Sequence, residues 1–115
     1  MPSTTAYKRW DVVLVPFPYS DFTATKRRPA LIVSPDSYNF GPDVTIAFVT
    51  SQVNSPSRIG DYRLIQWQAA GLPKPSMVRM KFVTVDKAIV MRKLGSLREE
   101  DRVAIGKALL SFFAS

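Results

Sequence analysis

Proline placement constrains the fold of this chain more than any other feature of its sequence. All nine prolines among the 115 residues lie between Pro2 and Pro75, and residues 76–115 contain none. A proline inside a helix removes a backbone hydrogen bond and clashes with the preceding turn, so the first part of the chain favours strands and loops over long helices. A chain of this length is expected to form a single domain, residues 1–115, with one core.

Short apolar runs bounded by turn residues predict the strands. The runs cover residues 11–17, 29–33, 44–49, 61–65, 76–80 and 82–90. The polar segments 19–28 and 53–60 read as exposed loops, and residues 66–70 are expected to form one helical turn that ends at Gly71.

The last twenty residues carry a helical pattern instead. Ser96 and Glu99 have the spacing of a capping box, and the acids from Glu99 to Asp101 fall in a first turn, where the helix dipole favours them. A broad apolar face over residues 97–114 predicts one amphipathic helix. The expected fold is mainly β with a C-terminal helix packed on a small barrel or strongly bent sheet.

The chain contains no cysteine and no histidine. This excludes disulfides and the Ser-His-Asp and Cys-His catalytic sets, and any zinc site would need carboxylates alone. Catalysis would have to use Arg, Lys, Asp, Glu, Tyr, Ser or Thr. The first ten residues lack a signal-peptide core and no apolar run is long enough to span a membrane, so a cytoplasmic protein with no membrane contact is expected.

The net charge of +7 is unevenly distributed. Residues 1–95 contain 13 of the 16 Lys and Arg and 6 of the 9 acids, and residues 96–115 contain three of each. A basic domain of this kind suits phosphate backbones or a strongly acidic partner. The alternative is a charged surface that only keeps a small protein soluble.

Several short motifs occur in a fixed order over about residues 9–113. They are DVVLV from Asp11, KRRPALIVSPD from Lys26, AFVTSQ from Ala47, WQAAGL from Trp67, PSMVR from Pro75, TVDK from Thr84 and RKLGSL from Arg92. In this order and spacing the series resembles the MazF/PemK toxins. The resemblance implies an SH3-like barrel, a homodimer, and an endoribonuclease that cuts single-stranded RNA without a cofactor or metal. It also implies a cognate antitoxin, usually acidic, that blocks the active groove.

In that family the ribose 2′-hydroxyl attacks the adjacent phosphate and leaves a 2′,3′-cyclic phosphate, which requires a base, positive donors and an acid. The resemblance assigns the catalytic positions to Arg28, Thr50 and Arg79. Arg79 is expected to bind phosphate, because arginine is a poor proton donor. The plainer interpretations are solvated charges for Arg28 and Arg79, and for Thr50 a strand-end hydroxyl bonded to its own backbone.

Further RNA contacts are expected next to these positions. The residues are Tyr19, Lys26, Arg27, Ser51, Gln52 and Lys81. In the segment 19–28, Tyr19 and Phe22 stand among cations, an arrangement in which rings stack on bases while charges hold phosphates. We expect this segment to gate the groove; covering the mouth of the barrel is the alternative role of its aromatic residues.

The sequence departs from the family pattern at two positions. The family often has an acid two residues after the second arginine, and here Lys81 stands there, on the same strand face as Arg79. Either Lys81 serves as the base, or it only binds phosphate and the base lies elsewhere, for example at Asp21 or Asp36, or is dispensable. Trp10 replaces the family's glycine before the first strand, which should alter only the start of that strand.

Two other functions suit the same fold. CcdB toxins are similar in fold, trap DNA gyrase and cut nothing, and such a protein would act through the end of its last helix, here residues 112–115. A gyrase binder has no need of Arg28, Thr50 and Arg79. The third possibility is a degenerate toxin that binds RNA without cutting it, which the change at Lys81 suggests. RNA cleavage separates the three functions.

Overall fold

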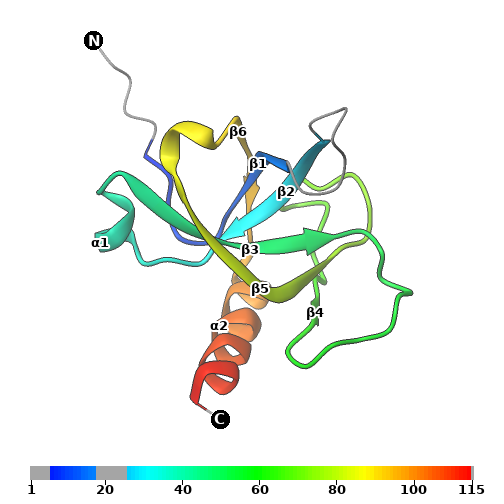
Figure 1. Cartoon of the computed structure of the whole chain (residues 1–115). Coiled ribbons are helices and arrows are strands. Elements are labelled where there is room, and N and C mark those ends of the chain that lie inside the picture. The colour runs from blue at the N-terminus through cyan, green and yellow to red at the C-terminus, as the bar shows by residue number, and fades with distance from the viewer. Residues whose placement is uncertain (1–5, 18–25, 115) are drawn as a thin grey trace.

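The computed structural model describes residues 6–17 and 26–114. Six strands form one antiparallel sheet in the order β4-β5-β3-β2-β1-β6. The strands are β1 (Asp11–Phe17), β2 (Lys26–Ile32), β3 (Asp43–Thr50), β4 (Tyr62–Arg63), β5 (Met77–Asp86) and β6 (Arg92–Ser96). The helices are α1 (Asp36–Asn39), the 3-10 helix η1 (Lys87–Ile89) and α2 (Glu99–Ala114). The strands curl into a half-barrel and α2 packs below them, as predicted (Figure 1).

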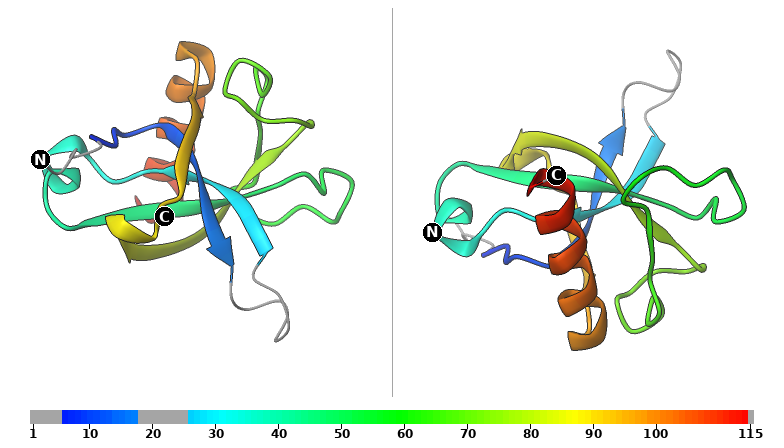
Figure 2. Two further views of the ribbon diagram at one scale, coloured as in Figure 1. Left: turned by 90° about the horizontal axis from the view of Figure 1, so that it is seen from above. Right: turned by 90° about the horizontal axis from the view of Figure 1, so that it is seen from below.

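Both faces of the sheet are buried. Successive residues of a strand point to opposite faces, so each strand can contribute to both cores. One face packs against α2, which crosses it in the views of Figure 2. The residues of this core include Val12, Leu31, Ala47, Val49 and Val78 of the strands with Ile105 and Leu109 of α2. The other face forms a second core inside the curl. Its residues are Val13, Val15, Ala30, Ile32, Val44, Ile46 and Val90.

The second strand begins earlier than predicted. β2 starts at Lys26, so Arg27 and Arg28 lie on a strand and not in a loop. The physical reason is its partner: Pro16 lies opposite Arg27 and Val15 opposite Arg28, so the ladder with β1 continues past the apolar run.

The fifth and sixth strands also differ from the prediction. β5 runs unbroken through Lys81 and ends at Asp86, where two strands, 76–80 and 82–90, are expected from the sequence. The Asp86 side chain accepts the Ala88 amide at 2.8 Å and begins η1. β6 is not predicted at all; its short run is stabilised by pairing with β1.

The predicted capping box is wrong, because Ser96 is a strand residue. Its hydroxyl donates to Asp11 Oδ1 at 2.7 Å, and α2 begins three residues later at Glu99. The predicted turn at residues 66–70 is confirmed, and Gly71 closes it with a left-handed φ of 87°.

Asp101 lies in the first turn of α2, as predicted, and has a further role that the sequence does not indicate. Its side chain is fully buried. Its two oxygens accept the Tyr62 hydroxyl at 2.6 Å and the amides of Ile65 and Gln66 at 3.0 and 2.9 Å. Burial, followed by the hydrogen bond to Asp101, raises the pKa of Tyr62 well above its ordinary value. Asp101 therefore fastens the start of α2 to the segment that follows β4.

Trp10 adopts a backbone conformation that favours glycine, with φ of 76°. Such a conformation costs a residue with a side chain about 1–3 kcal/mol and persists only where the surrounding structure imposes it. The Trp10 amide donates to Ile32 O at 2.8 Å, its carbonyl accepts from Leu97 N at 3.0 Å, and the Arg9 guanidinium carbon lies 4.6 Å from the centre of its ring. These contacts hold the start of β1 in place. None of the described helices has both the length and the apolar character to cross a membrane.

Candidate active site

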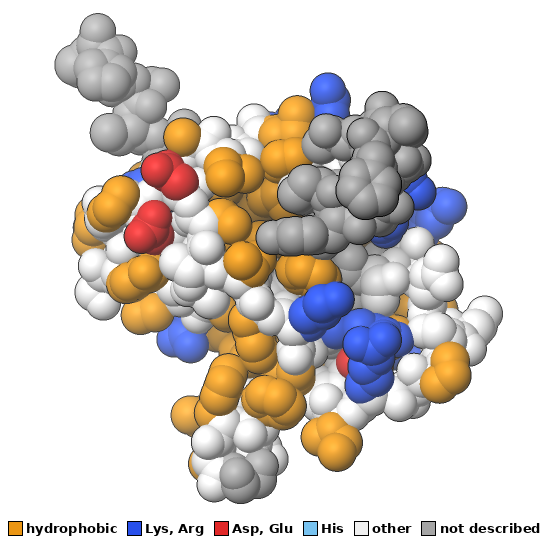
Figure 3. Space-filling view, viewed as in Figure 1, with side chains coloured by type: hydrophobic (Ala, Val, Ile, Leu, Met, Phe, Trp, Pro, Cys, Tyr) orange, Lys and Arg blue, Asp and Glu red, His pale blue; other side chains and the backbone are white. Residues whose placement is uncertain are grey.

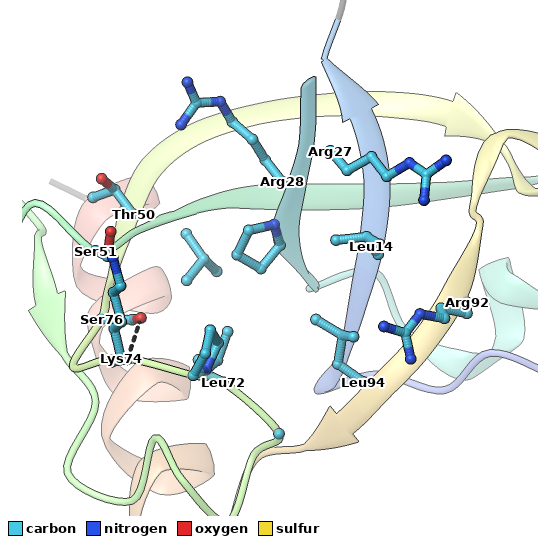
Figure 4. A pocket seen from close by; sticks show the side chains of 14 residues that line it. Leu14, Arg27, Arg28, Thr50, Ser51, Leu72, Lys74, Ser76, Arg92 and Leu94 are labelled. Carbon is cyan, nitrogen blue, oxygen red and sulfur yellow. Dashed lines mark hydrogen bonds between the residues drawn. The ribbon is translucent and has the colours of Figure 1, made fainter. Parts of the chain in front are cut away.

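Arg28 and Thr50 lie at the same end of neighbouring strands. β2 and β3 run antiparallel with Ala30 opposite Phe48, so Arg28, two residues before Ala30, reaches the level of Thr50, two residues after Phe48. Residues two apart on a strand point to the same face, and both side chains therefore leave one face of the sheet. Figure 4 shows them projecting to the same side.

Strand β5 adds Lys81 to this face. The register between β3 and β5 is interrupted around Phe48, so that residues 79–81 bulge opposite that single residue. Lys81 Nζ lies 5.0 Å from the centre of the Phe48 ring. We call the side chains of Arg28, Phe48, Thr50 and Lys81 the Arg28 face.

Arg79 is held by the loop between β3 and β4. Its Nη2 atom donates to Ser55 Oγ at 2.8 Å and to the Pro56 carbonyl at 3.4 Å, and it lies 3.7 Å from Asp61 Oδ2. Its side chain is 13% exposed. The structure thus places Arg79 under this loop.

A hollow with a volume of about 500 Å³ opens beside Arg28 and Thr50. Its floor is apolar and consists of Leu14, Pro29, Val49, Leu72 and Leu94. Its rim is cationic or hydroxylated and consists of Arg27, Arg28, Lys74, Arg92, Thr50, Ser51 and Ser76 (Figure 4). No acid is among the described residues that line it, and Arg79 is not among them either. An apolar floor with a cationic rim suits a flat ring that carries negative groups.

The Thr50 hydroxyl is oriented by the residues that follow it. Its Oγ1 atom accepts the Gln52 amide at 3.1 Å, and the Gln52 carbonyl accepts the Ser55 hydroxyl at 2.7 Å. Because a hydroxyl both accepts and donates, Thr50 can still direct its own hydrogen at a bound phosphate.

The other predicted site residues are scattered around this centre. Ser51 lines the hollow, whereas Lys26 and Gln52 are exposed beside it. Tyr19, with the predicted gating segment up to residue 25, lies outside the described residues.

Of the two candidate bases, Asp21 also lies outside the described residues. Asp36 is on α1, where its Oδ1 atom accepts the Arg9 amide at 2.7 Å. It lines a separate hollow with Lys8 and Lys87. Asp36 is therefore not placed beside Thr50.

Sequence reasoning misses three charged residues that the structure brings to this region. Lys74 and Arg92 complete the rim of the hollow from the segment before β5 and from β6. Asp61 reaches Arg79 from the end of the β3–β4 loop. Long-range folding brings all three to the site, and the sequence motif that begins at Arg92 does not indicate its place on the rim.

Positive charge gathers around the Arg28 face. In Figure 3, Lys and Arg side chains cluster toward the side on which β2 and the β3–β4 loop lie, and acidic side chains show near α1 at the opposite side. Such a distribution attracts polyanions to one side of the molecule.

Within residues 6–17 and 26–114, no three Asp or Glu side chains are grouped closely enough to hold a metal ion.

Comparison with known proteins agrees with this architecture. A family model described as PemK-like, MazF-like toxin of type II toxin–antitoxin system matches residues 8–113. An endoribonuclease from a mycobacterial species, solved in complex with its cognate antitoxin, is 19% identical, with a TM-score of 0.74 over 96% of this chain and 96% of that chain. No curated protein sequence matches the chain.

Two further solved structures have the same fold. The Mycobacterium tuberculosis toxin MazF-mt6 is 21% identical, with a TM-score of 0.72 over 90% of this chain and 96% of that one. MazF from Deinococcus radiodurans is 19% identical, with a TM-score of 0.71 over 96% and 98%.

Proposed function

This chain belongs to the PemK-like, MazF-like toxins of type II toxin–antitoxin systems, and we propose that it is a cytoplasmic endoribonuclease that cuts single-stranded RNA. The observation that supports the proposal is the strand register by which Arg28 and Thr50 extend from one sheet face at the same end of β2 and β3. The endoribonuclease with the same fold supports it.

The proposed reaction is an internal displacement at phosphorus. The ribose 2′-oxygen attacks the adjacent phosphorus and loses its proton, and the 5′-oxygen of the next nucleotide leaves and gains one. The products are a 2′,3′-cyclic phosphate and a 5′-hydroxyl. The planar fork of Arg28 suits two phosphate oxygens, and the Thr50 hydroxyl suits a third contact. Stabilising charge that develops in a transition state is worth about 10²–10³-fold in rate per donor.

The hollow gives the RNA a path next to this centre. A nucleobase would lie on Leu14, Leu72 and Leu94 while neighbouring phosphates meet Arg27 or Arg92. The side chains of Lys74, Ser51 and the Arg28 face extend the same basic surface. Binding should therefore weaken steeply with salt.

Two protein partners can be assigned to different surfaces of this chain. The cationic rim suits an inhibitory antitoxin, and the exposed end of α2 suits a second copy of the chain. An acidic antitoxin would occupy the cationic rim and exclude RNA. The exposed Leu110 and Phe113 of α2, 73% and 67% accessible, are candidates for the contact of a homodimer. Sedimentation of the purified chain tests the dimer.

RNA cleavage tests the proposed function. The purified chain is incubated with a long single-stranded RNA in EDTA, and the cut ends are mapped. We expect discrete cuts, slowed about 100-fold or more by Arg28→Ala. Arg98→Ala removes one exposed arginine before α2 and serves as the matched control, with an expected change of less than about threefold.

Failure has a defined meaning in this experiment. A folded wild-type protein that leaves every RNA intact would contradict the proposal. Capture of DNA gyrase would then favour the CcdB-like function, and tight binding of uncut RNA would favour the degenerate one.

A further inference from the structure

A carboxylate lies 3.7 Å from Arg79, although no acid stands two positions after it in the sequence. Lys81 stands two residues after Arg79, and Asp61 reaches the guanidinium from the β3–β4 loop instead. We propose that Asp61 is a positioning residue of the active site, which holds Arg79 and, through Arg79, the loop that orients Thr50. This inference rests on the proposed function.

The Asp61–Arg79 pair is shielded from water. The two side chains are 6% and 13% exposed, and Asp61 Oδ2 lies 3.7 Å from Arg79 Nη2. The same oxygen accepts the Arg58 amide at 2.8 Å, and the Asp61 amide donates to Arg58 O at 3.1 Å. A charge pair in this setting is screened far less than one at the surface.

The backbone fixes Asp61 at this place. Gly60 precedes it with φ of 88°, and a Cβ atom at Gly60 would lie only 2.4 Å from Met80 Cγ. The loop therefore crosses β5 at close range, beside Arg79. A glycine is needed both for the turn and for this approach.

Hydrogen bonds connect Arg79 with Thr50. Arg79 Nη2 donates to Ser55 Oγ, the Ser55 hydroxyl donates to the Gln52 carbonyl, and the Gln52 amide donates to Thr50 Oγ1. The distances are 2.8, 2.7 and 3.1 Å. A displaced Arg79 would release Ser55 and, with it, the turn that orients the Thr50 hydroxyl.

The pair is incompletely satisfied, which argues against a purely structural role. Among the described residues, neither Asp61 Oδ1 nor Arg79 Nε has a hydrogen-bond partner, and both atoms are buried. Buried polar atoms nearly always find partners, and a half-satisfied network contributes little to stability. A buried polar atom without a partner calls for an explanation, and a role in the active site supplies one here.

The test compares Asp61→Asn with Asp43→Asn, which removes the same charge at the start of β3. Single-turnover cleavage should fall about tenfold in Asp61→Asn and stay within about twofold in Asp43→Asn. The affinity for an RNA with a 2′-deoxy nucleotide at the cut site should stay within about threefold in both. Asp61→Glu, which restores the charge, should recover part of the rate. A wild-type rate in Asp61→Asn would overturn the inference.

A double-mutant cycle shows whether Asp61 acts through Arg79. In an Arg79→Ala background, Asp61→Asn should change the rate by less than about twofold, because the pair is already broken. A further tenfold fall there would mean that Asp61 acts independently, and would overturn the inference while the proposed function stands.

Hydrogen exchange gives a readout that does not depend on cleavage. The Gln52 amide, which donates to Thr50, should exchange faster in Asp61→Asn than in the wild type or Asp43→Asn. If the wild type cuts no RNA, the proposed function fails and the catalytic part of the inference fails with it. Unchanged exchange at Gln52 would overturn the positioning of the loop in either case.

Discussion

Two buried aspartates of this chain have opposite surroundings. Asp101 is fully enclosed, and three donors satisfy both of its oxygens at the start of α2. Asp61 is nearly as enclosed, but one of its oxygens has no partner among the described residues and the other faces Arg79 at 3.7 Å. The two carboxylates are therefore alike in burial and differ in how completely their oxygens are hydrogen-bonded.

The two sites also lie close along the chain. Tyr62, which donates to Asp101, directly follows Asp61. One short segment thus secures the helix on one side and the Arg79 loop on the other. Matched substitutions at the two aspartates should separate stability from activity.

Asp101→Asn should cause the largest loss of stability. The amide group would place a donor against the backbone amides that now meet a carboxylate, and the remaining hydrogen bonds would lose their charge assistance. We expect the free energy of unfolding to fall by about 3 kcal/mol, measured by urea denaturation. A fall below about 1 kcal/mol would contradict the structural role of Asp101.

Tyr62→Phe should have an intermediate effect. It removes only the hydroxyl that donates to Asp101 Oδ1 at 2.6 Å, while the two backbone amides remain. The expected loss in the free energy of unfolding is about 2 kcal/mol, the range of a hydrogen bond to a charged group. No change in the urea midpoint would show that this hydroxyl contributes nothing to the lock.

The pH dependence of stability also tests the contact between Tyr62 and Asp101. Burial and the Asp101 contacts raise the pKa of Tyr62, so the folded state keeps the phenol proton at a pH where the unfolded state has lost it. The stabilisation is fully present below the ordinary tyrosine pKa of about 10 and decreases as the pH rises beyond it. Between pH 10 and 11, wild type should lose more stability than Tyr62→Phe, and equal losses would contradict this.

Asp61→Asn should have the smallest effect on stability. The side-chain oxygen can still accept the Arg58 amide, and the lost contact with Arg79 is a single long one. We expect a change of about 1 kcal/mol in the free energy of unfolding, because Arg79 keeps its hydrogen bonds to Ser55 and Pro56. If Asp61→Asn unfolds as easily as Asp101→Asn, the distinction between the two aspartates is wrong.

Sequence patterns predict the locally encoded parts of this fold. β1 and most of β3 are apolar β-branched runs between turn residues, and both are found where expected. β6 is missed because Arg92 and Lys93 carry no strand pattern, and its pairing with β1 comes from residues about eighty positions away.

The sequence also does not predict which apolar residues of α2 are buried. Its apolar residues are visible in the sequence, but Ile105 and Leu109 are buried while Leu110 and Phe113 are exposed. Only the packing of α2 against the sheet decides between them. Ser96 has the spacing of a capping box with Glu99, but its hydroxyl donates to Asp11, which is distant in the sequence, and does not cap the helix.

Some residues of the site can be predicted from the sequence and others cannot. Arg28 and Thr50 are recognisable by motif, and the register of β2 and β3 brings them together. Asp61 cannot be predicted to meet Arg79, because a loop of no regular pattern separates it from β3. The lysine at position 81 signals only that a carboxylate is missing.

The most direct test of the proposed reaction is cleavage of an RNA with a single 2′-deoxy substitution at a mapped cut. We expect this bond to stay intact, the flanking sites to be cut as before, and the substituted RNA to bind as tightly as the unmodified one. Cleavage of the substituted bond at the normal rate would contradict attack of the 2′-hydroxyl on a phosphate bound at the Arg28 face.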